Sequence, residues 1–107
     1  MEAYNVRLLQ EAVDDLEEIV LYIAQSNRAA AGRMYDEIMK KINDLTDFPK
    51  RGRPVPDKRM RAAGYRVLDV KPYIIFYRVL NRNILIYHIL HGATNYPLLY
   101  ETILQTT

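Results

Sequence analysis

The sequence predicts an α+β fold, with the order strand, two helices, three strands and a short C-terminal helix. Three observations predict this order. Apolar residues recur at helical spacing, with acids between them, in the first half of the chain. Two continuous apolar runs separated by a short polar turn follow in the second half. At 107 residues the chain has the length of one domain. We therefore expect residues 1–107 to form a single domain, with helices on one side of a mainly antiparallel sheet.

The first half predicts a strand and a helical hairpin. Residues 3–9, AYNVRLL, have a strand-like composition. The segment 11–25, EAVDDLEEIVLYIAQ, and the segment 28–46 each place apolar residues on one helical face. Ser26 or Asn27 can cap the second helix with a side-chain oxygen. The short joint predicts that the two helices are antiparallel, and Phe48-Pro49 ends the second.

A basic segment follows the helices. Residues 50–61, KRGRPVPDKRMR, contain six basic residues and one acid. Gly52, Pro54 and Pro56 interrupt any regular pattern, so we expect an exposed loop.

The second half predicts three strands and a last helix. The runs 64–70, 73–80 and 84–90 read GYRVLDV, YIIFYRVL and ILIYHIL, and the last two are apolar on both faces, as central strands covered on two sides would be. Asn81 to Asn83 form the turn of a hairpin, since Asn tolerates a positive φ. Asn95 can cap a final helix that reaches about residue 104.

The sequence argues against several classes of site. The chain has no cysteine, so disulfides and thiolate metal sites are excluded. It has no P-loop, no G-x-G-x-x-G motif and no metal-binding His spacing, so we expect neither a cofactor nor a metal. It has no apolar run of about 18 residues and no signal-peptide pattern, so a soluble, cytoplasmic protein is expected.

Charge is divided unequally between the halves. Residues 1–48 contain five Lys/Arg and ten Asp/Glu, whereas residues 49–107 contain ten and three. This asymmetry predicts that the C-terminal half faces an anionic partner. The candidates for contacts with nucleic acid or another target are Arg51, Arg53, Lys58, Arg59, Arg61 and Lys71. The alternative is that the segment 50–61 is only a solvated loop.

Three other residues could carry chemistry. Arg66 lies in a strand, where it could bind a phosphate or pair with a carboxylate of the helices. His91 could act as a general acid or base, or could make a structural hydrogen bond. Tyr100 could stack on a base, transfer a proton or simply pack. Arg78 and His88 are expected to be structural, and His88 and His91 cannot line one site unless a bulge intervenes.

The chain resembles the toxins of the RelE/ParE superfamily, from bacterial type II toxin–antitoxin modules. The resemblance covers about residues 3–104. Its local motifs are LTDFPKRG at the end of the second helix, GYRVLDVKPYIIFYRV, and ILIYHILHGATNY at the last strand end. It implies a small antitoxin partner, and growth inhibition through either DNA gyrase, as in ParE-like members, or ribosome-dependent cleavage of mRNA, as in RelE-like members.

The resemblance implies a partial set of catalytic positions. In RelE-like members basic side chains on the sheet and a C-terminal tyrosine cut mRNA, and Arg66 and Tyr100 match two of these positions. Leu68, Ile74 and Thr94 stand where the other basic residues are expected. His91, Arg78 or the loop arginines could substitute for them.

Three functions therefore remain open. The first is a ParE-like toxin that inhibits gyrase by binding it, which requires no catalytic residues. The second is an mRNA endoribonuclease that uses Arg66, Tyr100 and His91. The third is a degenerate, inactive toxin or interaction module. An acidic amphipathic segment of the antitoxin would suit the basic half and exposed apolar grooves.

Overall fold

The computed structural model describes residues 3–92, 101 and 103. Its centre is a five-stranded sheet in the order β1-β5-β4-β3-β2. The strands are β1 (Asn5–Leu8), β2 (Arg53–Pro54), β3 (Tyr65–Val70), β4 (Tyr73–Leu80) and β5 (Asn83–His91). The edge strand β1 runs parallel to β5, and every other neighbouring pair is antiparallel, so the sheet is mixed.

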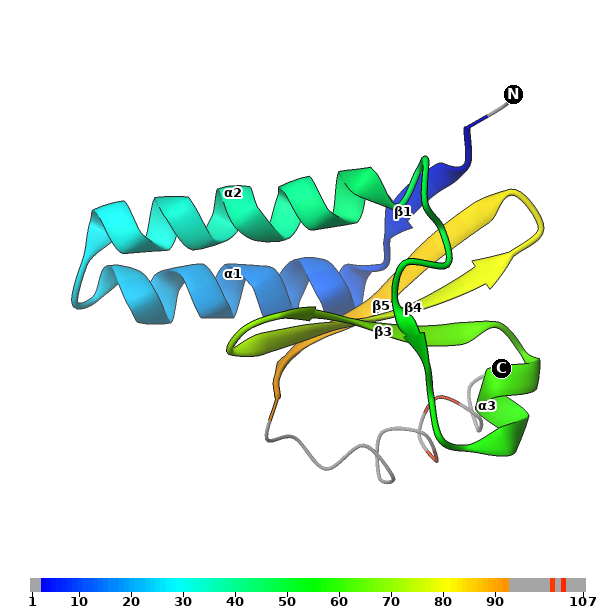
Figure 1. Cartoon of the computed structure of the whole chain (residues 1–107). Coiled ribbons are helices and arrows are strands. Elements are labelled where there is room, and N and C mark those ends of the chain that lie inside the picture. Colours follow the sequence, from blue (N-terminus) through cyan, green and yellow to red (C-terminus); the bar gives the residue numbers. More distant parts are fainter. Residues whose placement is uncertain (1–2, 93–100, 102, 104–107) are drawn as a thin grey trace.

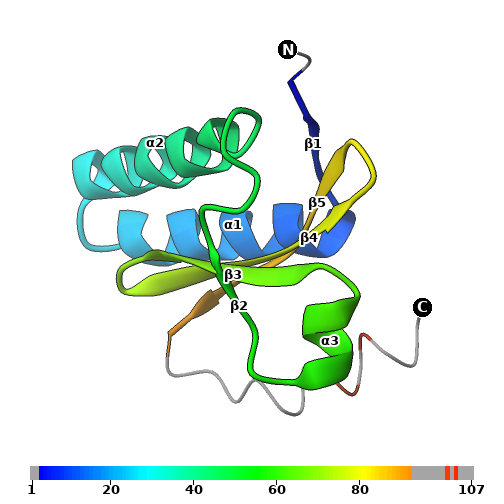
Figure 2. The same ribbon diagram turned by 45° about the vertical axis from the view of Figure 1, so that its right-hand side comes forward.

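Two long helices cover one face of the sheet (Figures 1 and 2). These are α1 (Gln10–Ala24) and α2 (Arg28–Asp44), which form the predicted antiparallel hairpin. Asn27 caps α2, since its side-chain oxygen accepts a hydrogen bond from the backbone N–H of Ala30 at 2.9 Å. The apolar stripe of each helix is buried against the sheet, through Ala12, Leu16, Ala31, Ile38 and Ile42.

The strands β4 and β5 are buried on both faces, as their continuous apolar sequences predicted. Side chains on the helical face belong to one core cluster, which includes Leu68, Val70, Ile75, Tyr77, Ile84 and Ile86. Side chains on the opposite face belong to a second cluster, which includes Val55, Met60, Tyr65, Val67, Ile74, Phe76 and Ile103. The turn between β4 and β5 has Asn81 at φ 58°, which confirms the expected hairpin.

The prediction of a simple exposed loop at residues 50–61 is wrong. This segment contains β2 and a short helix, α3 (Lys58–Ala62). The Asp57 carboxylate caps α3 by accepting a hydrogen bond from the Met60 N–H at 3.0 Å. Val55 and Met60 are fully buried. The sequence pattern did not predict these elements, because two apolar residues five positions apart do not form a recognisable period.

The helices are also not confined to one side. In Figures 1 and 2 the helix α3 lies on the face of the sheet opposite to α1 and α2. Ile103 is buried in the cluster on that second face. Most of the expected C-terminal helix, including Tyr100, lies outside the described residues. Among the described residues, no helix combines the length and apolar character needed to cross a bilayer.

Candidate functional site

The turn between α2 and β2 is fixed to the sheet by a buried tyrosine. The Tyr77 hydroxyl donates to the Pro49 carbonyl at 2.8 Å and accepts from the Gly52 N–H at 2.9 Å. A Cβ added at Gly52 would come within 2.7 Å of the Tyr77 hydroxyl and of the Val67 carbonyl, so glycine is required there. Burial raises the pKa of Tyr77, so its hydroxyl stays protonated and can keep both hydrogen bonds.

Arg66 supports the same turn from β3. Its Nη1 atom donates to the carbonyl oxygens of Gly52, at 2.5 Å, and Lys50, at 3.3 Å. No carboxylate among the described residues pairs with it, so the alternative of an ion pair to the helices is not formed there. The guanidinium is held by neutral carbonyl groups and keeps its full positive charge.

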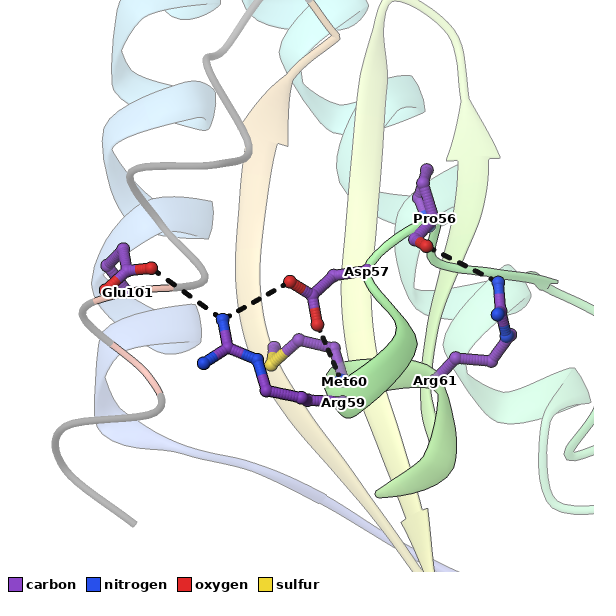
Figure 3. Close-up of polar contacts among 6 residues, drawn as sticks. All are labelled: Pro56, Asp57, Arg59, Met60, Arg61 and Glu101. Atoms are coloured by element: carbon purple, nitrogen blue, oxygen red, sulfur yellow. Dashed lines mark hydrogen bonds and ion pairs between the residues drawn. The ribbon is translucent and has the colours of Figure 1, made fainter.

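Three of the arginines proposed for target binding are instead paired with carboxylates. Arg51 lies 3.9 Å from the Asp44 carboxylate and stacks over the Phe48 ring. Arg53 pairs with Asp69. Arg59 lies 3.4 Å from the Asp57 carboxylate and 3.8 Å from the Glu101 carboxylate (Figure 3).

The other members of the proposed set are placed differently. Arg61 extends to the opposite side of α3 from Arg59 (Figure 3), and its guanidinium lies 3.4 Å from the Pro56 carbonyl. Lys58 and Lys71 are exposed. Lys71 lies in the turn between β3 and β4, two residues after Asp69, which is the carboxylate partner of Arg53.

His91 is also remote from Arg66. In the β-ladder Arg66 is opposite Tyr77 and His91 is opposite Tyr73, four residues apart along β4. This separation corresponds to about 13 Å. The ring of His91 lies edge-on to that of Tyr73, with the centroids 6.0 Å apart. The structure therefore does not bring these two candidate catalytic residues together.

A bulge in the β4–β5 ladder explains His88. The register shifts between Phe76 and Tyr77, so β5 carries an extra residue there. The Asp15 carboxylate of α1 accepts a hydrogen bond from the Ile89 N–H at 3.0 Å and lies 2.9 Å from His88 Nδ1. His88 is thus a structural residue, as expected, and the bulge is the feature that the sequence could not reveal.

Arg78 is structural as well. Its Nε donates to the Ala63 carbonyl at 2.7 Å, and its guanidinium lies over the Tyr65 ring. Arg78 is therefore held by a backbone carbonyl and an aromatic ring, which confirms the expected structural role.

The apolar residues at expected basic positions are core residues. Leu68 is 7% exposed on the helical face, and Ile74 is 3% exposed on the opposite face. Neither could present a cation to a substrate without disrupting the core. Thr94 lies outside the described residues. The described residues also contain no group of three or more His, Asp or Glu that could hold a metal ion.

An apolar groove runs along the helical hairpin. This hairpin groove has a volume of about 390 Å³, and its lining includes Leu8, Val13, Leu16, Leu21, Tyr35 and Met39. Val13 is 40% exposed and Leu21 is 58% exposed. Exposed apolar surface of this kind is typical of sites that bind a protein segment, a membrane or an apolar ligand. The helical spacing predicted which residues form the apolar face of each helix. It did not predict that Val13 on that face would remain exposed.

Comparisons with known proteins identify the family of this chain. A family model described as the ParE toxin of the type II toxin–antitoxin system parDE matches residues 6–96. A relative named "Putative toxin Y4kP", from Sinorhizobium fredii (strain NBRC 101917 / NGR234), is 31% identical over 97 residues, covering 91% of this chain and 97% of the relative.

Two solved structures share the fold. One is described as the chromosomal ParDE toxin–antitoxin system from P. aeruginosa, with a TM-score of 0.65 and 21% identity over 83% of this chain and 96% of that chain. The other is the toxin–antitoxin complex RelBE2 from Mycobacterium tuberculosis, with a TM-score of 0.63 and 20% identity over 83% of this chain and 98% of that chain.

Proposed function

Because this chain belongs to the ParE toxin family of type II toxin–antitoxin systems, within the RelE/ParE superfamily, we propose that it arrests growth by binding DNA gyrase. The proposed action is inhibition by binding, without a hydrolytic step. A partner protein, the cognate antitoxin, neutralises it.

The burial of Leu68 and Ile74 is the observation that carries this proposal. RNA-cleaving members of the superfamily use a set of cationic side chains to stabilise charge on the phosphate being cleaved. Loss of one such donor typically lowers the rate by about 10²–10³. Two core residues at these positions therefore favour a toxin that binds its target over one that cleaves RNA.

The second candidate is a ribosome-dependent mRNA endoribonuclease. It is favoured by Arg66, whose guanidinium has no carboxylate partner among the described residues and so remains available to a phosphate. In this case Arg66 stabilises the phosphate charge, while Tyr100 or His91 supplies the acid or base. The separation of about 13 Å between Arg66 and His91 along the sheet makes Tyr100 the better partner.

The antitoxin is proposed to bind in the hairpin groove. The solved relatives include toxin–antitoxin complexes, and an amphipathic helix fits an apolar groove of this kind. The groove lies in the acidic half of the chain and includes Glu17 in its lining. The segment that fills it should therefore carry basic residues at its edges, in place of the acidic segment expected from the charge of the other half.

The target is tested by pulse labelling after induction of this chain alone in bacteria. Gyrase inhibition predicts an early stop in thymidine incorporation while methionine incorporation continues, and purified chain should inhibit supercoiling by gyrase. An early stop in methionine incorporation would instead support the endoribonuclease. If neither stops while the chain is folded and abundant, the inactive interaction module is the correct alternative.

The antitoxin site is tested with two exposed leucines. Leu21→Glu places a charge in the hairpin groove, where Leu21 is 58% exposed, whereas Leu80→Glu places one at the end of β4, where Leu80 is 39% exposed. We expect Leu21→Glu to weaken antitoxin binding about thirtyfold, which corresponds to about 2 kcal/mol for one buried leucine. Leu80→Glu should bind as the wild type does. Equal binding of all three proteins would exclude the groove as the site.

A further inference from the structure

The turn after α2 exposes an aromatic side chain. The chain has two phenylalanines, of which Phe76 is fully buried and Phe48 is 55% exposed. A hollow of about 460 Å³, which we call the aromatic hollow, is lined by Tyr4, Phe48, Pro49, Lys50 and Arg51. An exposed aromatic side chain beside a hollow is typical of a contact surface for another molecule.

Two arginines stack on the aromatic rings of the hollow. The guanidinium of Arg51 lies over the Phe48 ring, 4.7 Å from its centroid, and that of Arg82 lies over the Tyr4 ring at 5.3 Å. Tyr4 lies beside the turn because its backbone N–H donates to the Thr46 carbonyl at 3.1 Å (Figure 1). Each stack combines a flat apolar surface with a positive charge. Aromatic residues and arginine are the types enriched in the cores of protein interfaces.

The turn that carries Phe48 is fixed before any partner binds. The Phe48 N–H donates to the Asp44 carbonyl at 3.0 Å, and the Phe48 carbonyl accepts from the Arg51 N–H at 3.1 Å. The Tyr77 hydroxyl and the Arg66 guanidinium hold the rest of the turn from the sheet. A surface fixed in this way loses little conformational entropy when a partner binds.

The charge of the aromatic hollow suits an acidic partner. Lys50 and Arg51 are the charged members of its lining, and both are cations. The Arg51 guanidinium lies 3.9 Å from the Asp44 carboxylate, whereas Lys50 is exposed and has no ion-pair partner among the described residues. A carboxylate next to an apolar pocket would therefore complement Lys50 and the Phe48 ring together.

The hairpin groove selects the opposite chemistry. Its lining includes Glu17, so the antitoxin segment proposed for it carries basic residues at its edges. The two surfaces share no lining residue, and a segment with basic edges does not suit the aromatic hollow. This difference favours a second partner for the aromatic hollow. The other partner in the proposed function is the protein target whose inhibition arrests growth.

We propose that the toxin contacts its target protein through the aromatic hollow, with the Phe48 ring in an apolar pocket of the target and Lys50 against a carboxylate. A protein is favoured over a polynucleotide because the lining offers one unpaired cation, whereas polynucleotide binding depends on several phosphate contacts. This inference rests on the proposed function and deepens it, because it assigns the surface that inhibits the target.

The test compares two exposed aromatic residues. Phe48→Ala removes the ring from the hollow, whereas Tyr22→Ala removes a ring that is 71% exposed on α1 and lies outside the hollow. Growth arrest is measured after induction in bacteria, and purified proteins are assayed for inhibition of supercoiling by gyrase. Phe48→Ala should abolish arrest and require about thirtyfold more protein for half-inhibition, the loss typical of a hot-spot residue. Tyr22→Ala should act as the wild type does.

A pair of lysine variants keeps the Phe48 ring in place. Lys50→Glu and Lys40→Glu change the net charge equally and both lysines are exposed, but only Lys50 lines the hollow. Lys50→Glu should weaken inhibition about tenfold, whereas Lys40→Glu should change it less than about twofold. This pair decides the outcome if a thermal melt shows that Phe48→Ala does not fold.

Four results would overturn the inference. The first is full toxicity of folded Phe48→Ala, and the second is loss of antitoxin binding in that variant with arrest intact, which would assign the hollow to the antitoxin. The third is binding of a single-stranded RNA that requires Phe48, and the fourth is a folded, abundant wild type that is harmless. Arrest without inhibition of gyrase would instead refute only the proposed target, because the arrest assay still reports on Phe48.

Discussion

The substitution Tyr77→Phe tests whether one hydroxyl holds the turn that carries Lys50. The phenyl ring fills the same space in the core, so no cavity forms and only the hydrogen bonds are lost. Pro49 is half-buried, and its carbonyl can accept a hydrogen bond from water instead. Gly52 is buried, so its N–H loses the hydroxyl acceptor at 2.9 Å without replacement.

The expected cost follows from that one donor. A buried N–H left without an acceptor costs about 1–3 kcal/mol, so we expect a loss of about 2 kcal/mol in the free energy of unfolding. For a chain of this length the loss corresponds to a fall in Tm of about 8 °C. Urea-induced unfolding followed by circular dichroism measures the free energy, with the slope m expected to be unchanged.

Tyr65→Phe is the matched control. The Tyr65 hydroxyl is buried without a well-formed hydrogen bond, and the side chains of Tyr87 and Arg78 lie near it. Removing it therefore costs no hydrogen bond and relieves the burial of an unsatisfied polar group, so stability should stay the same or increase. A Tyr77→Phe variant as stable as wild type, or two variants with equal losses, would refute the role given to the Tyr77 hydroxyl.

Three further predictions concern other fixed points of the fold. Gly64→Ala should lower the free energy of unfolding by more than about 1 kcal/mol in urea titrations, because an added Cβ would lie 2.4 Å from the Val79 carbonyl at a φ of +93°. Asp15→Ala should cost about 1–3 kcal/mol in the same assay, because the Ile89 N–H near the bulge loses its acceptor, whereas Asp14→Ala on the same helix should cost less. The hydrogen bond from the Met60 N–H lowers the pKa of Asp57 below 3.8. The cap of α3 therefore stabilises the fold above that pH, and its contribution is lost as the pH falls through the lower pKa of the folded state. Asp57→Asn should remove this acid dependence in thermal melts.

The structure changes which basic residues are the best candidates for contacts with a target. From sequence, all six candidate contact residues of the basic half were equivalent, because each was simply a charged residue near a predicted loop. The structure separates the arginines with carboxylate partners, such as Arg59, from those without, such as Arg61 (Figure 3). It also adds Lys50, which lines the aromatic hollow beside Phe48.

Local patterns in the sequence were sufficient for the larger elements. The helical hairpin and the strands β4 and β5 were predicted because their periodicity extends over many residues and each pattern reflects burial on one face or on both. Asn81 marked the hairpin turn because few other residues adopt a positive φ. The helix α3 was missed because five residues with a single buried Met60 give no detectable period.

The sequence by itself determined the α+β order, the resemblance to RelE/ParE toxins and the division of charge between the halves, because these depend on composition and short-range spacing. Only the tertiary structure decided that Arg66 is held by backbone carbonyls and not by a carboxylate, that Asp15 fills the acceptor position at a bulge, and that Arg59 and Arg61 face opposite sides. The physical reason is that a charged side chain takes whichever partner the folded backbone brings within about 3 Å. That partner is set by contacts between residues distant in sequence, such as Gly52 and Arg66, which are 14 positions apart.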